Sequence, residues 1–378
     1  MPKSATQKSF SQLMLSATRL TSVGKLMDAT RLIQRTLWGG EPDTHRSMPS
    51  SNSNLHSPAA RINVESPSVD HAKHESALAA DSNPRDLERP ASFTKHQFVF
   101  DGDAYPYRLY IPPASSTQAA VLMPLVVLLH GCKQDALDFS HGTAMNALAE
   151  KHHAMVLYPE QITSGNAMRC WNWFEPSHQQ AGRGEPGMIA ALVQKMVTQH
   201  GANPDRIYVA GLSAGGAMAA VVANLYPHLF AAVGMHSGLA AGAAQSVAQA
   251  FNAMQDGAKG SHTTALPTIV FQGDADQTVH PSNAKYITQA ALAAFKAEGL
   301  ELVKSKTSVK NSGDETADRT LYSDANGKPF VESWRIAAGP HAWSGGAARG
   351  SYTDPDGPDA SAAMLAFFLR HRKGQNRR

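Results

Sequence analysis

One segment, residues 206–220, constrains the fold of this chain more than any other. A β-rich run is followed by Gly-x-Ser-x-Gly around Ser213 and then by an Ala-rich run typical of a helix. This order predicts a strand, a tight turn and a helix, which is the context of an exposed nucleophilic serine. Gly211 and Gly215 leave room for the crowded backbones of such a strained turn. We therefore expect Ser213 to act as a nucleophile at a sheet edge; an ordinary Gly-rich turn is the alternative.

Length and composition set bounds on the rest of the chain. Its 378 residues, 42% of them hydrophobic, suffice for one large α/β domain with an appendage. The net charge of +3 gives no case for a nucleic-acid partner. No apolar run approaches membrane-spanning length, and no secretory signal is evident at the N-terminus. A cytoplasmic location is expected, and export by a route without a recognisable signal peptide is the alternative.

The sequence pattern divides the chain into four expected parts. Residues 1–40 form an amphipathic helical segment, because apolar residues recur at helical spacing between residues 10 and 38. Residues 41–92 are polar and Pro-rich and are expected to form a flexible linker. A catalytic domain over 93–372 and a basic tail at 373–378 complete the chain. The helical segment either packs on the main domain or docks on a partner or an apolar surface.

Within the main domain, β-rich and helical runs alternate. Asp101-Gly102 between two β-rich runs is a hairpin signal. Strands are expected at 98–100, 107–111, 124–132, 155–158, 207–210, 231–237, 268–273 and 332–336, and helices at 144–151, 185–200, 217–225, 281–298 and 359–371. Such alternation predicts a doubly wound, mostly parallel sheet. The arrangement is that of an α/β-hydrolase, in which the nucleophile precedes the acid and the histidine comes last.

A serine nucleophile requires a base that is oriented by a carboxylate. Asp276 follows the strand at 268–273 and is the expected acid, and Asp274 in the same turn is the reserve, with a turn or capping role as its alternative. Among seventeen histidines, His341 lies on the loop after the last expected strand, where the base belongs. His130 is expected beside the oxyanion turn and His236 in the interior.

The oxyanion of acyl transfer requires backbone N–H donors. Ala214 follows the nucleophile and supplies the first, and Cys132, after the strand that ends in His130-Gly131, supplies the second. The sequence contains no metal-ligand spacing and no phosphate- or dinucleotide-binding Gly motif. We therefore expect a mechanism without metal or cofactor.

Several separated motifs together resemble one family. They are residues 130–132 (HGC), 170–174 (CWNWF), 211–216 (GLSAGG), 273–276 (GDAD), 341–346 (HAWSGG) and 352–361 (YTDPDGPDAS). They are similar to the catalytic domain of poly(3-hydroxybutyrate) depolymerases and related esterases, a group that includes feruloyl and acetylxylan esterases. The resemblance covers about residues 95–372. It implies Ser213 as nucleophile, Asp276 as acid, His341 as base, and the Cys132 and Ala214 amides as oxyanion donors.

The resemblance also implies a Cys132–Cys170 disulfide and a crevice lined by Trp171 and Trp173. Trp343 is also expected to face the substrate. The expected function is hydrolysis of poly(3-hydroxybutyrate) or its oligomers through an acyl-enzyme. Feruloyl, acetyl or synthetic polyester substrates are the alternative, and a non-catalytic granule-associated protein is a third interpretation. A polymer granule surface is the expected partner, and residues 10–38 are candidates for contacting it. The sequence leaves the oligomeric state open.

Overall fold

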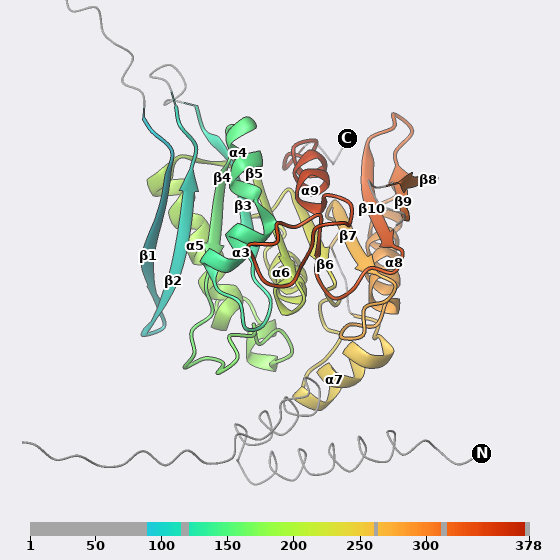
Figure 1. Ribbon diagram of the computed structural model, residues 1–378, viewed down its shortest axis with the longest axis horizontal. Helices are drawn as coiled ribbons and strands as arrows, with labels where there is room; N and C mark the ends of the chain where they lie inside the picture. Colours follow the sequence, from blue (N-terminus) through green and yellow to red (C-terminus); the bar gives the residue numbers. More distant parts are fainter. Residues whose placement is uncertain (1–88, 115–120, 261–263, 311–315, 375–378) are drawn as a thin grey trace, which may run out of the picture. The chain divides into compact units, whose positions relative to one another are not determined.

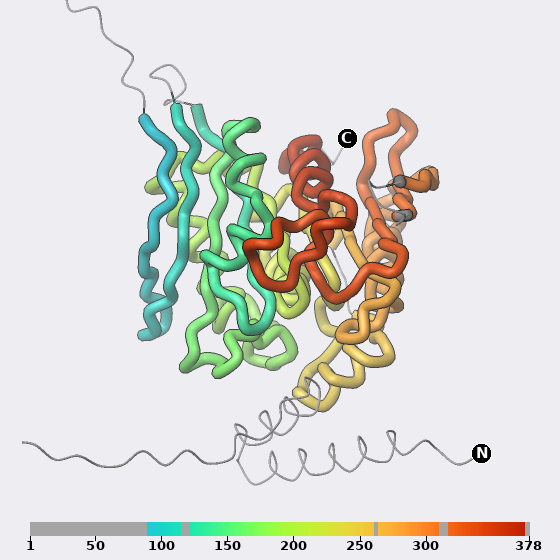
Figure 2. The backbone as a smooth tube through the Cα atoms, viewed as in Figure 1, coloured from blue at the N-terminus to red at the C-terminus, as the bar shows by residue number. Residues whose placement is uncertain are grey.

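The computed structural model describes residues 89–114, 121–260, 264–310 and 316–374 (Figures 1 and 2). The predicted helical segment and nearly all of the predicted linker therefore lie outside the described residues. The predicted hairpin is confirmed: β1 (Ser92–Phe100) pairs antiparallel with β2 (Asp103–Ile111). Asp101 and Gly102 both have positive φ, 50° and 87°, which suits the twist of the flanking strands.

The described residues form a ten-stranded sheet in the order β1-β2-β4-β3-β5-β6-β7-β10-β9-β8. The strands after the hairpin are β3 (Met123–Leu129), β4 (Met155–Pro159), β5 (Ala202–Leu212), β6 (Ala232–His236), β7 (Thr268–Gly273), β8 (Val303–Lys310), β9 (Thr316–Ser323) and β10 (Pro329–Ile336). From β4 through β10 the six central strands are parallel. Strands β3, β4, β6 and β7 are buried along their whole length, as expected when helices cover both faces of a parallel sheet. The predicted doubly wound, mostly parallel sheet is confirmed.

Helices cover both faces of this sheet (Figure 1). Side chains of α5 (Gly184–His200), α6 (Ala214–Leu225), α7 (Val247–Asp256) and α8 (Ser282–Ala297) contribute to one apolar cluster. Those of α3 (Ala136–Thr143), α4 (Met145–Lys151) and α9 (Ala360–Phe368) contribute to the other. Successive residues of a strand point to opposite faces, so Val127 lies in the first cluster and Val126 and Leu128 lie in the second.

The sequence pattern missed the hairpin of β8 and β9, which extends the sheet beyond β10. Lys304, Lys306 and Ser308 of β8 are exposed, so this strand lacks the alternation of apolar residues that identifies a half-buried strand. Lysines are common on edge strands, where they hinder pairing with other chains. The short helices α3 and α7 were also not predicted. Two further two-residue strands, β11 (Trp343–Ser344) and β12 (Thr353–Asp354), pair within the segment that follows β10.

Candidate active site

Ser213 occupies the turn between β5 and α6. Its backbone has φ 57° and ψ −120°, a region that costs a residue with a side chain about 1–3 kcal/mol and that clusters at functional sites. A Cβ atom on Gly215 would lie 2.1 Å from the Leu129 carbonyl oxygen, and one on Gly211 would lie 2.4 Å from the Gly215 carbonyl carbon. Only glycine fits at either position. The strand, turn and helix predicted around Ser213 are all present.

Asp276 and His341 lie in contact although 65 residues separate them in the sequence. Asp276 follows β7 and His341 follows β10, and these two strands are parallel neighbours. The Ala275 N–H donates to the Gly339 carbonyl at 3.2 Å, which joins the two loops. As a result, His341 Nδ1 lies 2.8 Å from Asp276 Oδ2. With Nδ1 donating to the carboxylate, Nε2 is the nitrogen free to act as base.

The Asp276 carboxylate is buried, with 5% of the residue exposed. Its Oδ1 accepts from the Thr278 and Val279 amides at 2.9 and 2.8 Å, and its Oδ2 accepts from Gln272 Nε2 at 3.0 Å. Burial by itself raises the pKa of this group, but the bond from His341 and the two amide bonds outweigh burial and hold the pKa of Asp276 below its usual value. The group is therefore an anion near neutral pH.

Asp274, the reserve candidate, has other partners. Its Oδ2 pairs with Arg335 at 2.7 Å, and its Oδ1 accepts from the Ala338 amide at 2.6 Å. These contacts give it the turn-stabilising role that was its alternative. The geometry thus favours Asp276 as the acid.

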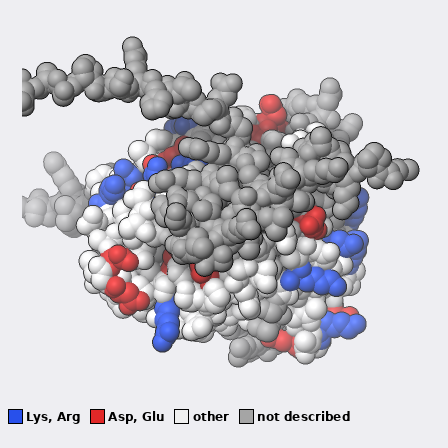
Figure 3. Space-filling view, turned by 90° about the horizontal axis from the view of Figure 1, so that it is seen from below, with Lys and Arg blue, Asp and Glu red and all other residues white. Residues whose placement is uncertain are grey.

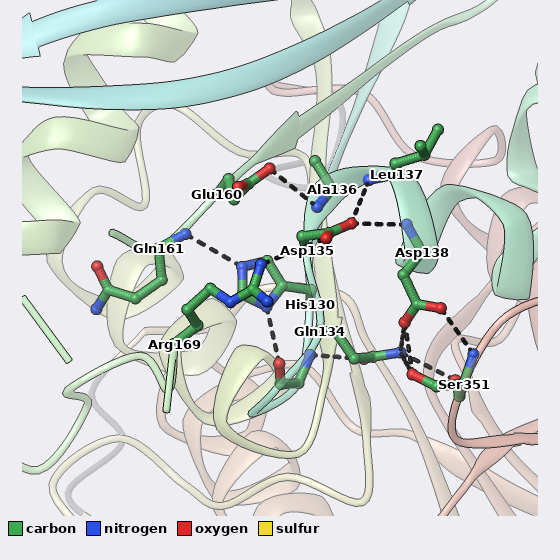
Figure 4. Close-up of polar contacts among 11 residues, drawn as sticks. His130, Gln134, Asp135, Ala136, Leu137, Asp138, Glu160, Gln161, Arg169 and Ser351 are labelled. Carbon is green, nitrogen blue, oxygen red and sulfur yellow. Dashed lines mark hydrogen bonds and ion pairs between the residues drawn. The ribbon is translucent and has the colours of Figure 1, made fainter. Parts of the chain in front are cut away.

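The loop after β3, residues 131–138, carries the second expected oxyanion donor; we call it the oxyanion loop (Figure 4). The amides of Gly131 and Lys133 donate to Gln134 Oε1 and to the Met168 carbonyl. No acceptor is found for the Cys132 amide among the described residues. Its peptide partner, the Gly131 carbonyl, accepts from His130 Nδ1 at 2.8 Å. Because a trans peptide is planar, fixing this carbonyl also fixes the direction of the Cys132 N–H.

Two buried histidines hold loops of the site. His130 Nε2 accepts from the Gln161 amide at 3.1 Å, and burial lowers its pKa to about 4. His236 Nε2 accepts from the Ser344 amide at 3.0 Å, and burial lowers its pKa to about 3. Both rings are therefore neutral acceptors at neutral pH. The sequence placed His236 in the interior, but its bond to the loop of His341 could not be foreseen, because 108 residues separate it from Ser344.

The three tryptophans expected to face substrate lie in the interior. Trp171, Trp173 and Trp343 are 0%, 3% and 1% exposed. Trp171 donates its ring N–H to the His130 carbonyl at 3.0 Å, and Trp343 donates to Ser361 Oγ at 2.9 Å. In this structure the three rings are part of the core, and these buried acceptors satisfy the indole N–H groups of Trp171 and Trp343. A substrate contact of these residues stays a prediction.

Glu185 is a buried residue that the sequence reasoning missed. It is 2% exposed, lies in the first turn of α5, and accepts from the Asn172 amide at 2.7 Å and from Asn172 Nδ2 at 2.6 Å. It also accepts from Gln161. A glutamate in the first turn of a helix is ordinary, so nothing in the sequence marked it. It anchors the Trp171–Trp173 loop.

The disulfide implied by the resemblance is present and joins Cys132 to Cys170. Among the described residues no group of three or more His, Cys, Asp or Glu could hold a metal ion, and no helix has the length and apolar character to cross a membrane. Acidic and basic side chains are interspersed on the face shown in Figure 3, among the atoms that it leaves uncovered.

Comparison with known proteins places this geometry in a family. The model of the family described as esterase PHB depolymerase matches residues 105–298, just over half of the chain. The chain belongs to this family. The match contains Ser213 and Asp276, and His341 lies beyond it.

Two curated relatives are similar to parts of this chain. Poly(3-hydroxyalkanoate) depolymerase C of Paucimonas lemoignei is 33% identical over 242 residues, 58% of this chain and 54% of that protein. Acetylxylan esterase A of Talaromyces purpureogenus is 28% identical over 199 residues, 46% of this chain and 50% of that protein. The chain thus spans about half the length of these relatives.

A solved structure supports the fold. The acetyl xylan esterase from Aspergillus awamori matches with a TM-score of 0.54 at 19% identity, over 73% of this chain and 99% of that one. Together with the observed sheet, this match shows that the chain has an α/β-hydrolase fold.

Proposed function

We propose that this chain is a serine carboxylic-ester hydrolase in which Ser213, His341 and Asp276 form the catalytic triad. The observation that carries the proposal is the 2.8 Å contact between His341 Nδ1 and the buried Asp276 carboxylate. The strained turn at Ser213 lies at the carboxyl end of a parallel strand of the same sheet. Catalytic hydrogen bonds often tighten only when substrate binds, so the contact between serine and histidine is expected to form in the substrate complex.

The proposed reaction has two halves. In the first, Ser213 Oγ attacks the ester carbonyl carbon while His341 Nε2 takes the hydroxyl proton, and the tetrahedral intermediate expels the alcohol, which receives that proton. In the second, His341 removes a proton from water, hydroxide adds to the acyl-enzyme, and Ser213 leaves with the proton returned by His341. Asp276 holds the imidazole orientation and stabilises the imidazolium in both halves.

The intermediate carries a negative charge on the former carbonyl oxygen. The amides of Cys132 and Ala214 are proposed to donate to it, and one such donor lowers the barrier by about 3 kcal/mol. The Ala214 amide is the first of α6, so it also lies at the positive end of that helix.

We propose poly(3-hydroxybutyrate) or its oligomers as the substrate. The description of the family, esterase PHB depolymerase, supports this assignment, and the poly(3-hydroxyalkanoate) depolymerase C from Paucimonas lemoignei is consistent with it. A second substrate class, acetyl or feruloyl esters, is supported by the acetylxylan esterase from Talaromyces purpureogenus and by feruloyl esterase B of Neurospora crassa, 32% identical over 132 residues.

Release of 3-hydroxybutyrate tests the assignment. Wild type and Ser213→Ala are compared on amorphous polymer granules, crystalline film and soluble trimer. We expect release from granules or trimer that depends on Ser213. If none of the three substrates yields product while p-nitrophenyl esters and acetylated xylan are cleaved, the second substrate class replaces the first.

The disulfide bears on location. Structural disulfides persist mainly in oxidising compartments and are rare in the cytosol, so the Cys132–Cys170 bond supports export over the expected cytoplasmic location. Counting free thiols after alkylation inside the producing cells tests this: a cytoplasmic enzyme would be recovered with two free thiols.

Residues 10–38 lie outside the described residues, and we propose that they contact the polymer surface. Co-sedimentation with granules is compared for the full chain and a chain lacking residues 1–92. Equal sedimentation of the two would refute the role, provided that both hydrolyse soluble esters equally.

A further inference from the structure

Three side chains that belong to no predicted catalytic role join the oxyanion loop to the loop that follows His341: Gln134, Asp138 and Ser351 (Figure 4). Gln134 is 1% exposed. Its Nε2 donates to the Ser351 carbonyl at 2.9 Å and to Asp138 Oδ2 at 3.0 Å. We call these three residues the clasp.

Asp138 completes the clasp from the first turn of α3. Its Oδ1 accepts from the Ser351 amide at 2.9 Å, and its Oδ2 accepts from the Ser351 hydroxyl at 2.5 Å. Ser351 is thus bound through its N–H, its carbonyl and its side chain. Close by, the Ala347 amide donates to the Gly142 carbonyl at 2.8 Å. The segment after His341 is therefore bonded both to the oxyanion loop and to α3, which lie more than 200 residues away in the sequence.

Gln134 also bonds to the backbone of Gly131, the residue before the proposed oxyanion donor. Its Oε1 accepts from the Gly131 amide at 2.9 Å, and its own backbone amide donates to the Gly131 carbonyl at 3.3 Å. These two bonds restrain both peptide units that flank Gly131. The second of these peptides carries the Cys132 N–H, so Gln134 acts on the direction of that donor through a rigid plane.

We propose that Gln134, Asp138 and Ser351 are positioning residues. Together they fix the direction of the Cys132 N–H relative to the loop that carries His341. The inference rests on the proposed esterase function. It adds the hydrogen bonds that align the oxyanion donor with the loop that carries the catalytic base. An oxyanion donor works only when it is aimed at the oxygen of the tetrahedral intermediate, and removing one lowers kcat about 10²–10³-fold. A donor that is present but poorly aimed loses part of that factor.

The test compares Ser351→Ala with Ser351→Thr, which keeps the hydroxyl. Ser308→Ala is the matched control, since Ser308 donates to Asp318 at 3.1 Å between β8 and β9, in another part of the sheet. With a p-nitrophenyl ester we expect Ser351→Ala to lower kcat about tenfold at nearly unchanged KM, as a share of the loss caused by deleting a donor. Ser351→Thr should recover most of this loss, and Ser308→Ala should match wild type.

A second measurement separates positioning from general support of the fold. Phenylboronic acid forms a tetrahedral adduct with a catalytic serine, so its affinity should fall in Ser351→Ala by the same factor as kcat/KM. Hydrogen exchange should quicken together in residues 131–134 and 345–351 of this variant. A Ser351→Ala enzyme with wild-type kcat and boronate affinity would overturn the clasp, and so would an equal loss in Ser308→Ala.

Failure of the proposed function would give a different result from failure of the clasp. It would appear as a wild-type chain whose Ser213 reacts with neither p-nitrophenyl esters nor a fluorophosphonate. In that case the coupled exchange of the two segments would still support the clasp as a structural link, and unchanged exchange would refute it.

Discussion

Two loops of the site begin in the same way and are held in different ways. The oxyanion loop follows β3, and the acid turn, residues 273–279, follows β7; both strands are parallel members of the central sheet. Apart from His341, the partners of the Asp276 carboxylate come from residues 272–279. The oxyanion loop instead depends on Arg169, Cys170 and Ser351, which lie 34 to 217 residues from their partners in the loop.

This difference separates what each loop needs in order to form. A carboxylate bound by amides two and three residues later makes a local turn, so the Asp276 carboxylate is held mainly by residues close to it in the sequence. The turn also contacts residues 335–339, through the Asp274–Arg335 pair and the bond from the Ala275 amide to the Gly339 carbonyl. The oxyanion loop reaches its geometry only when two distant segments, around residues 169–170 and 351, have folded against it. We therefore expect substitutions in the acid turn to affect chemistry more than stability, and substitutions around the oxyanion loop to affect both.

The largest effect is expected for Asp276→Asn. The side chain keeps its size, but the amide no longer fixes the tautomer of His341 or stabilises its cation, and kcat should fall about 10⁴-fold. Steady-state kinetics on a soluble ester measure this.

Asp274→Asn is the matched control, because it lies two residues away in the same turn and loses an exposed ion pair with Arg335. Such pairs contribute about 0–1 kcal/mol, so its kcat should stay within about threefold of wild type. If Asp274→Asn were the more damaged variant, the two carboxylates would exchange roles.

The next effect concerns the covalent link of the oxyanion loop. Replacing Cys132 and Cys170 together by Ala opens a loop closed over 38 residues, and the chain-entropy relation gives a loss of about 4 kcal/mol in the free energy of unfolding. The Cys132 N–H is a backbone group and is retained. Urea unfolding should therefore show a large loss, and kcat should fall by much less than in Asp276→Asn. Unchanged stability would mean that the non-covalent contacts of this loop hold it without the disulfide.

Sequence reasoning succeeded where a pattern is local. Three such patterns each depend on only a few neighbouring residues. They are the hairpin at Asp101-Gly102, the strand, turn and helix at Ser213, and the carboxylate after β7. The choice of Asp276 over Asp274 also rested on the turn alone, and the observed partners of the two carboxylates favour it. The disulfide was anticipated through the family resemblance, not through the residues themselves.

The reasoning failed where partners are distant or where a pattern is missing. No sequence pattern marks Glu185, Gln134 or Asp138. Their partners, Asn172 for Glu185 and Ser351 for the other two, reach them only in the folded chain. Trp171 and Trp343 were expected to face substrate, and the sequence did not show that both rings are buried, because burial depends on which acceptors the fold supplies for their N–H groups. Strand β8 was missed because its exposed lysines interrupt the alternation of apolar and polar residues. Edge strands carry such charges to hinder pairing with other chains.

As the pH falls, the stability contributed at the two loops should be lost over different pH ranges. Burial lowers the pKa of His130 to about 4, below the ordinary value near 6.5, so the unfolded chain takes up this proton first as the pH falls. The stability that His130 contributes is therefore complete above pH 6.5 and is lost as the pH falls toward 4. The pKa of Asp276 is also lowered, but from a value near 4, so its contribution persists until the pH falls below that range.

The unfolding free energies of wild type and His130→Gln at pH 7 and pH 4.5 measure the first of these effects. Between the two pH values, wild type should lose about 3 kcal/mol more than the variant, since about two pH units separate pH 4.5 from the unfolded pKa. The variant itself will be less stable at pH 7, but only the change with pH enters the comparison. Equal losses in the two proteins would show that His130 is not the neutral group that its bond from Gln161 requires.

The smallest effect is expected beside the acid turn, at the end of β7. Gln272 Nε2 donates to Asp276 Oδ2, the same oxygen that accepts from His341. Gln272→Met keeps the volume and removes this donor, a loss of about 1 kcal/mol of carboxylate stabilisation, or about fivefold in kcat. The pKa of Asp276 should rise, so activity should begin to fail at a higher pH than in wild type during acidification. A kcat–pH profile measures both changes. If Gln272→Met lowered kcat as much as Ser351→Ala does, the acid turn would depend on its supporting residues as strongly as the oxyanion loop, and the contrast between locally and distantly held loops would not extend to catalysis.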